Sequence, residues 1–504
     1  MCVDIFETTN GAVRGHRPVP DVVATLGVPY AAPPFGADRF REPRAAAAWT
    51  GVRDGTRFGP IAPQSARLPG APVWSPGGED ILTVNVWTPA PGGARLPVLV
   101  WIHGGAYTFG SSAQPDFDGV ALARAGLVVV TANHRLGFEG FGHVPNGREG
   151  VFPDNRGLLD QVAALRWVRE NIAAFGGDPD NVTVAGQSSG ATSAACLMVM
   201  DRARGLFRRV IAHSAVAPVH SLELAAATTT EVAAAAGCAD TAEALLSTTP
   251  QTLVAACDRV LDGYRRDPSS GPRHYGSAIH APVVDGEVLP ADPLTGLAAG
   301  RAPDLDLLVC HTAEESWLFD AVGGSPKVTT AEQLAAFAAD FRLPDGLVTA
   351  YRAALPQAPT LDVYLAIFGD LMFGEYTRRL AEAHARAGGR AHASRFVRRP
   401  DGPGAPARAW HCADVPFAFG NLDADAVRFL IGGPPDPADR RLSGQMVRAW
   451  ADFAGTGDPG WPPIDTTGEH TRIWDTDDDR LPDERRPVPV RTPWTAAEFA
   501  VLRP

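Results

Sequence analysis

The sequence has 504 residues, a formal net charge of −12, 45% hydrophobic residues and 20% charged residues. A chain of this length can bury a large core, and this composition is typical of a soluble globular protein. The acidic balance argues against nucleic acid as a partner. The longest apolar runs, "LPVLVWI" and "AGLVVVTA", have the length of strands and are too short to span a bilayer, so we expect no membrane partner.

The cysteines and the first residues bear on the cellular compartment. The six cysteines contain no CxxC pair, which predicts neither a zinc site nor a dense disulfide framework. The stretch "MCVDIFETTNGAVRG" lacks the basic segment and apolar run of a secretory signal. We therefore expect a cytoplasmic protein that needs no metal, and no pattern indicates another cofactor. We also expect a monomer or a small homo-oligomer.

Strand and helix patterns alternate along the chain. Residues 96–102 form a buried-type strand that ends in glycines, and residues 126–135 contain a second apolar, β-branched run. Residues 160–177 have apolar side chains at helical spacing and end in two glycines, a helix stop signal. A short strand over 181–186 and a helix over 189–200 follow. This alternation predicts an α/β protein with a mostly parallel central sheet flanked by helices.

No shift in composition marks a domain boundary, so we expect residues 1–504 to form one domain with helical insertions. Residues 320–400 are rich in alanine and predict a helical lid or wall over the sheet. The acidic run over 475–484, "DTDDDRLPDE", lacks the glycine and terminal glutamate of an EF-hand loop. We interpret it as a solvated turn rather than a metal site.

A nucleophile pattern lies between the strand over 181–186 and the helix that follows. Residues 186–190, "GQSSG", fit G-x-S-x-G with Ser188 at the centre. A nucleophile on a sharp strand-to-helix turn takes a strained backbone, so its neighbours must be small. Ser188 is therefore the candidate nucleophile, and the backbone N–H of Ser189 is a candidate donor to an oxyanion.

The other donors of an oxyanion hole are predicted upstream, in "WIHGGAYTFG". Small residues after a strand let backbone N–H groups approach a substrate carbonyl closely. Gly105 and Ala106 are the candidates. Together with the G-x-S-x-G pattern, they indicate acyl transfer.

These blocks resemble the type B carboxylesterase/cholinesterase family, especially its bacterial p-nitrobenzyl esterase branch. The similar segments are "GVPYAAPPFGADRFREP", "EDILTVNVWTP", "NHRLG", the long run "NRGLLDQVAALRWVRENIAAFGGDPDNVTVAGQSSGA" and "WADFAGTGDPGWP". They extend from about residue 11 to about residue 475. The resemblance implies an α/β-hydrolase fold with a Ser-Glu-His triad.

The resemblance also places the acid and the base. The acid is expected in "TAEESWLF" at Glu315, although the adjacent Glu314 stands where the family has aspartate and remains a competitor. The base is expected at His411, in "HCADVPFAFGN". The chain order of nucleophile, acid and base is that of α/β hydrolases. Because histidine ordinarily titrates near pH 6.5, we expect hydrolysis to fall below about pH 6–7.

Further residues take their roles from the same resemblance. Gln187 stands beside the nucleophile where the family often has glutamate, and Ser214 is implied to lie behind the nucleophile. Two structural salt bridges are implied, Arg39 with Glu79 and Arg135 with Asp160. Ile81 replaces a disulfide cysteine of many relatives, in agreement with a reducing compartment.

The expected activity is hydrolysis of small to medium apolar carboxylic esters through an acyl-enzyme. Aromatic and methionine side chains that flank the catalytic blocks are candidates for an apolar pocket, although each could equally be an ordinary core residue: Tyr107, Phe109, Trp317, Phe319 and Met372. A lipase, an amidase or an acyltransferase with the same triad remains an alternative. A non-catalytic binding protein of the same fold is disfavoured because all three triad positions are filled.

Overall fold

The computed structural model describes residues 4–66, 73–89, 93–145, 151–217, 219–400, 407–464, 470–476, 491–499 and 501–503. Its main sheet has ten strands in the order β15-β14-β13-β10-β9-β7-β8-β6-β4-β3. Their bounds are β3 His16–Val19, β4 Val22–Pro29, β6 Thr83–Thr88, β7 Leu96–Ile102, β8 Val128–Ala132, β9 Gly177–Gln187, β10 Arg209–His213, β13 Asp306–Thr312, β14 Arg390–Phe396 and β15 Thr471–Trp474. Neighbours from β15 to β8 pair in parallel, and β6, β4 and β3 add an antiparallel end.

Two small sheets accompany the main one. The first has the order β1-β2-β5, and the second pairs β11 with β12. Their bounds are β1 Ile5–Thr8, β2 Gly11–Arg14, β5 Val52–Asp54, β11 His220–Ser221 and β12 Val283–Val284.

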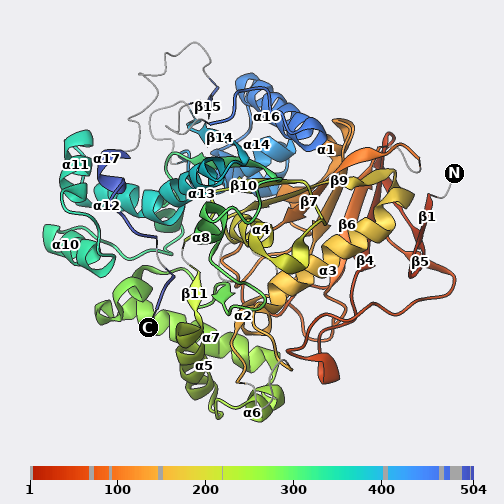
Figure 1. Ribbon diagram of the computed structural model, residues 1–504, viewed down its shortest axis with the longest axis horizontal. Coiled ribbons are helices and arrows are strands. Elements are labelled where there is room, and N and C mark those ends of the chain that lie inside the picture. The colour runs from red at the N-terminus through yellow and green to blue at the C-terminus, as the bar shows by residue number, and fades with distance from the viewer. Residues whose placement is uncertain are drawn as a thin grey trace.

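Helices fill the connections between the strands (Figure 1). Up to the end of β13 they are α1 Val120–Arg124, α2 Gly137–Phe141, α3 Arg156–Asn171, α4 Ser189–Val199, α5 Leu222–Ala236, α6 Ala242–Ser247, α7 Pro250–Arg266 and α8 Pro293–Ala298. After β13 come α9 Trp317–Ala321, α10 Ala331–Asp340, α11 Leu347–Ala354, α12 Thr360–Gly369, α13 Glu375–Arg386, α14 Val415–Phe419, α15 Arg428–Ile431, α16 Pro437–Thr456 and α17 Arg491–Trp494.

Strand β7 shows how the sheet separates two apolar layers. Val98, Val100 and Ile102 belong to one buried cluster, with residues of α3, α4 and α13. Leu99 and Trp101 belong to the other, with residues of α1, α14 and α16. Successive side chains of a strand point to opposite faces, so a strand covered on both sides has an uninterrupted apolar sequence. In Figure 1, α16 lies on the opposite side of the sheet from α3.

The alternation predicted from the sequence is present in the structure. Strand β7 has the predicted bounds, and β8 falls within the second apolar run. The helix predicted over 160–177 begins earlier, at Arg156, and passes at Ile172 into a 3-10 turn. Gly176 ends that turn with φ +86, a left-handed conformation that glycine adopts without steric cost.

Residues 320–400 contain the last two residues of α9 and the whole of α10 to α13, but they also include β14, which joins the main sheet. Helices α10, α11 and α12 share an apolar cluster of their own with Trp494, centred on Phe337 and Tyr364. Helices α10, α11 and α12 lie at one side of the molecule, at the opposite end from β1 and β5 (Figure 1). Of the acidic run over 475–484, residues 477–484 lie outside the described part of the chain.

Two buried ion pairs connect the segment after β8, which includes α2, to α3 and to the loop that contains Arg39. Arg135 binds Asp160 with both side chains almost fully buried, as predicted. The predicted pair of Arg39 with Glu79 is wrong. The carboxylate of Glu139 binds Arg39 at 2.6 Å, because α2 carries that carboxylate into the buried space beside the guanidinium.

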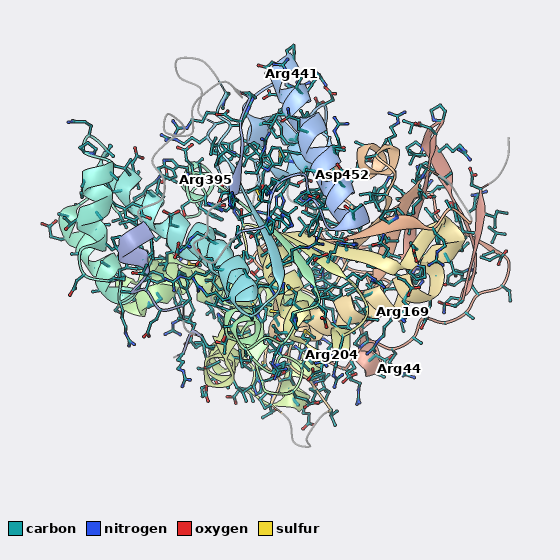
Figure 2. All side chains as sticks on the ribbon, turned by 45° about the horizontal axis from the view of Figure 1, so that its top comes forward. Arg44, Arg169, Arg204, Arg395, Arg441 and Asp452 are labelled. Carbon is teal, nitrogen blue, oxygen red and sulfur yellow. The ribbon has the colours of Figure 1, made fainter. Side chains whose placement is uncertain are left out.

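Surface arginines behave differently from these buried ones. Arg44 and Arg204, labelled in Figure 2, are mostly exposed and pair with Asp38 and Asp201 at 3.0 Å and 2.8 Å. Exposed pairs of this kind contribute about 0–1 kcal/mol to stability.

The five cysteines in the described part of the chain are free thiols. No helix among the described residues is long and apolar enough to cross a membrane.

Candidate active site

The turn between β9 and α4 holds Ser188 in a strained conformation. Its φ of 57° and ψ of −126° are rare for a residue with a side chain. Glycines make the turn possible, because a Cβ on Gly190 would lie 2.1 Å from the carbonyl oxygen of Ile102. The backbone N–H of Ser188 donates to the carbonyl of His213 at 2.8 Å. The turn is thus fixed to both neighbouring strands, β7 and β10.

The predicted oxyanion loop lies directly against this turn. A Cβ on Gly104 would lie 3.2 Å from the Ser188 Cβ. Gly105 has φ +117 and Ala106 has φ +53, which turns the loop sharply after β7. No described residue accepts a hydrogen bond from the N–H of Gly105, Ala106 or Ser189. Three donors are therefore available near the serine, as an oxyanion hole requires.

His411 and Glu315 come from two distant segments and meet beside this turn. His411 Nδ1 lies 2.6 Å from Glu315 Oε2, with both side chains buried. The other carboxylate oxygen of Glu315 accepts from Ser214 Oγ at 2.6 Å and from the N–H of Thr312 at 2.7 Å. Burial lowers the pKa of His411, but Cys412 and Glu315 raise it, and its pKa lies above the ordinary value.

Glu314, the competing acid, points to a different cluster. Its carboxylate binds Arg399 and Arg408, with Arg399 Nε at 2.6 Å and Arg408 Nη1 at 3.1 Å. It also accepts from the N–H of Ala409 at 3.2 Å. This geometry separates the two adjacent glutamates, because only Glu315 is hydrogen-bonded to His411.

The His411 ring has a polar neighbour that sequence patterns did not indicate. Gln187 Nε2 lies 2.9 Å from His411 Nε2 and 3.5 Å from His411 Nδ1, so the amide lies over the ring. Within the described part of the chain, no hydrogen bond joins Ser188 Oγ to His411. Catalytic hydrogen bonds are often long in an unliganded enzyme and shorten when substrate binds. The rings of Phe319 and Phe373 lie against the His411 ring, with centroids 5.4 Å and 4.3 Å away.

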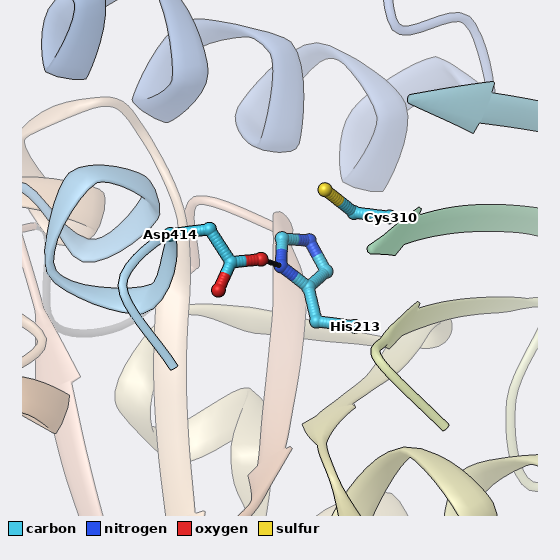
Figure 3. A group of neighbouring side chains, drawn as sticks. All are labelled: His213, Cys310 and Asp414. Atoms are coloured by element: carbon cyan, nitrogen blue, oxygen red, sulfur yellow. Dashed lines mark hydrogen bonds and ion pairs between the residues drawn. The ribbon is translucent and has the colours of Figure 1, made fainter. Parts of the chain in front are cut away.

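A second buried histidine, His213 at the end of β10, lies beside Asp414 and Cys310 (Figure 3). His213 Nδ1 is 2.6 Å from Asp414 Oδ2, and Trp450 Nε1 donates to His213 Nε2 at 3.2 Å. With Cys310 they form a group with metal-ligand atoms, but both histidine nitrogens already have protein partners. Burial also raises the pKa of the Cys310 thiol, which favours the protonated form rather than a metal-binding thiolate. We interpret the group as a support for the His213 carbonyl that binds Ser188.

A cavity of about 100 Å³ opens beside the oxyanion loop. Its walls are mainly apolar and include Ala106, Tyr107, Ala217, Leu224, Phe368 and Met372. Of the predicted pocket residues, Tyr107 and Met372 line this cavity, and Phe319 lies against His411 instead. Phe109 and Trp317 are not among its lining residues; the Trp317 indole donates to Asp362 at 3.3 Å. No sequence pattern indicated the polar lining residues His220, His280 and Arg273.

A mostly parallel sheet, with a serine on a strained strand-to-helix turn and a histidine–carboxylate pair beside it, defines an α/β hydrolase. The comparisons with known proteins then identify the family. A model of the carboxylesterase family matches residues 3–481. The chain belongs to the carboxylesterase family.

Individual relatives cover nearly the whole chain. The para-nitrobenzyl esterase of Bacillus subtilis (strain 168) is 35% identical over 494 residues, which are 95% of this chain and 96% of that protein. The phenmedipham hydrolase of Pseudarthrobacter oxydans is 34% identical and covers 89% of this chain and 88% of its own. A crystal structure of a carboxylesterase from Geobacillus stearothermophilus has a TM-score of 0.83 at 35% identity and covers 97% of this chain and 99% of its own. The chain is therefore a carboxylic ester hydrolase.

Proposed function

We propose that this carboxylesterase hydrolyses small to medium apolar esters through an acyl-enzyme on Ser188. The single observation that supports it most is the 2.6 Å contact of His411 Nδ1 with Glu315 Oε2. A carboxylate at Nδ1 holds the imidazole so that Nε2 is available as a base. The close approach of the Gly104 loop to Ser188 also supports it, because the N–H groups of Gly105, Ala106 and Ser189 have no acceptor among the described residues.

In the proposed mechanism, His411 Nε2 takes the proton of Ser188 as Oγ attacks the ester carbonyl. The N–H groups of Gly105, Ala106 and Ser189 stabilise the oxyanion. The imidazolium then protonates the leaving alcohol, and an acyl-serine ester remains. Water repeats the attack with His411 as base, so the acid leaves and Ser188 is regenerated. Glu315 orients His411 and stabilises the imidazolium.

The apolar cavity beside the oxyanion loop supports the choice of substrates. Its apolar walls favour alkyl and aryl groups over charged ones, since burying an unpaired charge is costly. The relative named para-nitrobenzyl esterase also supports substrates with an aromatic group. We propose p-nitrophenyl esters of short fatty acids as suitable probes.

The test compares hydrolysis of p-nitrophenyl acetate, butyrate and octanoate by the native protein and by Ser188→Ala. We expect the substitution to lower kcat by about 10⁴–10⁶-fold, as for other triad nucleophiles. A native protein inert to all three esters, or an active Ser188→Ala variant, would contradict the proposal. The ratio of the three rates measures the length of chain that the cavity accepts.

We also propose that the protein works in the cytoplasm, as a monomer or a small homo-oligomer. The free state of the five described cysteines supports a reducing compartment. Cell fractionation checks the compartment, and light scattering on the eluting protein checks its mass in solution. Secretion of the active enzyme into the medium would contradict the first part.

A further inference from the structure

Leu502 forms part of the wall of the apolar cavity beside the oxyanion loop. It lines this cavity together with Ala106 and Tyr107 of that loop. Ala106 carries one of the N–H groups proposed to bind the oxyanion, so the cavity reaches the place where the ester carbonyl would lie. Leu502 stands outside residues 3–481, which match the carboxylesterase family model. This wall residue is therefore not part of the pattern that the family model describes.

Backbone hydrogen bonds hold Leu502 beside strand β11. Its N–H donates to the carbonyl of Val219, and its carbonyl accepts from the N–H of Ser221, both at 2.9 Å. Leu502 thereby forms a parallel bridge with His220. Paired residues of neighbouring strands present their side chains to the same face, and both His220 and Leu502 line the cavity. The bridge therefore directs the Leu502 side chain into the cavity.

Contacts away from the cavity hold the segment before Leu502. Trp494 is fully buried, and its indole N–H donates to Tyr351 Oη at 2.8 Å. Arg379 on α13 donates to the carbonyl of Ala497 at 2.7 Å. These four residues are not among those that line the cavity. Because neither they nor the backbone bonds depend on the Leu502 side chain, a substitution at 502 changes the cavity wall and leaves these contacts in place.

We propose that Leu502 is a specificity-determining residue, whose side chain limits the size of the hydrocarbon group that the cavity accepts. The inference rests on the proposed function, because it takes the cavity to hold one side of an ester bound at Ser188. Leu502 is partly buried and offers only apolar surface, so the group that packs against it must also be apolar.

The direction of the effect follows from the volume of the side chain. Alanine at 502 would leave space for further carbon atoms of the substrate, and tryptophan would fill space that leucine leaves open. The two substitutions should therefore shift the preferred chain length in opposite directions. A general disturbance of the fold would instead lower the rates for all esters in both variants.

The experiment measures kcat/KM for two series of esters in the native protein, Leu502→Ala and Leu502→Trp. The first series, p-nitrophenyl acetate, butyrate and octanoate, varies the acyl group. The second series, methyl, butyl and octyl acetate, varies the alcohol group and is followed by the uptake of alkali at constant pH. Within each series, the readout is the ratio of kcat/KM for the eight-carbon group to kcat/KM for the four-carbon group.

We expect Leu502→Ala to raise this ratio by about 10-fold in one series and Leu502→Trp to lower it by about 10-fold in the same series, since one methylene in an apolar pocket is worth at least that factor. The series that responds identifies the side of the ester that lies in the cavity. Unchanged ratios in both series, or a shift in the same direction for both variants, would overturn the inference. If Leu502→Trp does not fold, as judged by circular dichroism, an unchanged or lowered ratio in Leu502→Ala has the same meaning.

The same two substitutions at Leu305 are the matched control. Leu305 is partly buried, as Leu502 is, but it does not line the cavity. It stands before β13, whereas Glu315 follows that strand, so it lies at the opposite edge of the sheet from the catalytic residues. Both Leu305 variants should keep the native ratios.

Failure of this inference can be separated from failure of the proposed function. If the native protein hydrolyses none of the esters, or if Ser188→Ala stays active, the proposed function fails and the inference fails with it. If the native protein is active and Ser188→Ala is not, while the Leu502 variants keep the native ratios, only the role of Leu502 is refuted.

Discussion

Ser214 Oγ donates a 2.6 Å hydrogen bond to Glu315 Oε1, the carboxylate oxygen that does not face His411. Ser214 follows directly on β10, and its φ of 51° turns the side chain toward the end of β13. The nucleophile is bound to the same segment, because the N–H of Ser188 donates to the carbonyl of His213. One strand end therefore supports both the serine and the acid.

Replacing Ser214 by alanine should lower kcat by about 10- to 150-fold with little change in KM. The loss of a hydrogen bond to a charged group costs about 1.5–3 kcal/mol, and 1.36 kcal/mol corresponds to a factor of ten in rate. Ser443→Ala, which removes a buried hydroxyl bound to the Phe417 carbonyl at 2.9 Å, is the control. Equal kcat values for the two variants would mean that Ser214 has only a structural role.

Replacement by glutamine should affect the two adjacent glutamates differently: at Glu315 it should lower kcat, and at Glu314 it should lower stability. Glu315→Gln should lower kcat by about 10³–10⁴-fold, because the amide no longer stabilises the imidazolium at His411. Glu314→Gln breaks the contacts with Arg399 and Arg408 and should lower the free energy of unfolding by about 1–3 kcal/mol while kcat is kept. Steady-state kinetics and urea unfolding distinguish these outcomes, and reversed results would reassign the acid.

The acidic limb of the native enzyme's pH profile should lie at a higher pH than the ordinary pKa of histidine predicts. Burial lowers the pKa of His411, but Cys412 and Glu315 raise it above 6.5 overall. Since the ring must be neutral to act as a base, the half-maximal kcat/KM on the acidic side is expected above pH 6.5. A profile of kcat/KM from pH 5 to pH 10 checks this, and full activity at pH 5 would exclude His411 as the base.

Replacing a glycine by alanine should have different effects near the strained turn at Ser188 and within an ordinary helix. Gly190→Ala places a methyl group against the carbonyl of Ile102 and should abolish activity or folding. A Cβ on Gly263, within α7, would meet no atom within 4 Å. Gly263→Ala should therefore raise the free energy of unfolding by about 0.5–1 kcal/mol and keep kcat, because alanine favours the helix. Thermal unfolding measures the effect on stability, and the ester assay measures the effect on kcat. A stable and active Gly190→Ala variant would contradict the predicted clash with the Ile102 carbonyl.

The sequence by itself determined the α/β class and the candidate nucleophile. Both depend on local chemistry: uninterrupted apolar runs such as β7 predict buried parallel strands, and the glycines around Ser188 are needed by a sharp turn. The bounds of β7 agree with the prediction for the same reason. The helix before β9 was placed too late because its first turn, from Arg156, is stabilised by burial rather than by a sequence signal.

Which side chains meet in the active site depends on the folded arrangement of distant segments. Glu314 and Glu315 are neighbours in sequence, but the turn after β13 sends one to Arg399 and the other to His411. The replacement of Glu79 by Glu139 as the partner of Arg39 has the same origin. The contact of Gln187 with His411 joins residues 224 positions apart. Local patterns carry no information on such contacts, since they depend on how the whole sheet brings its strand ends together.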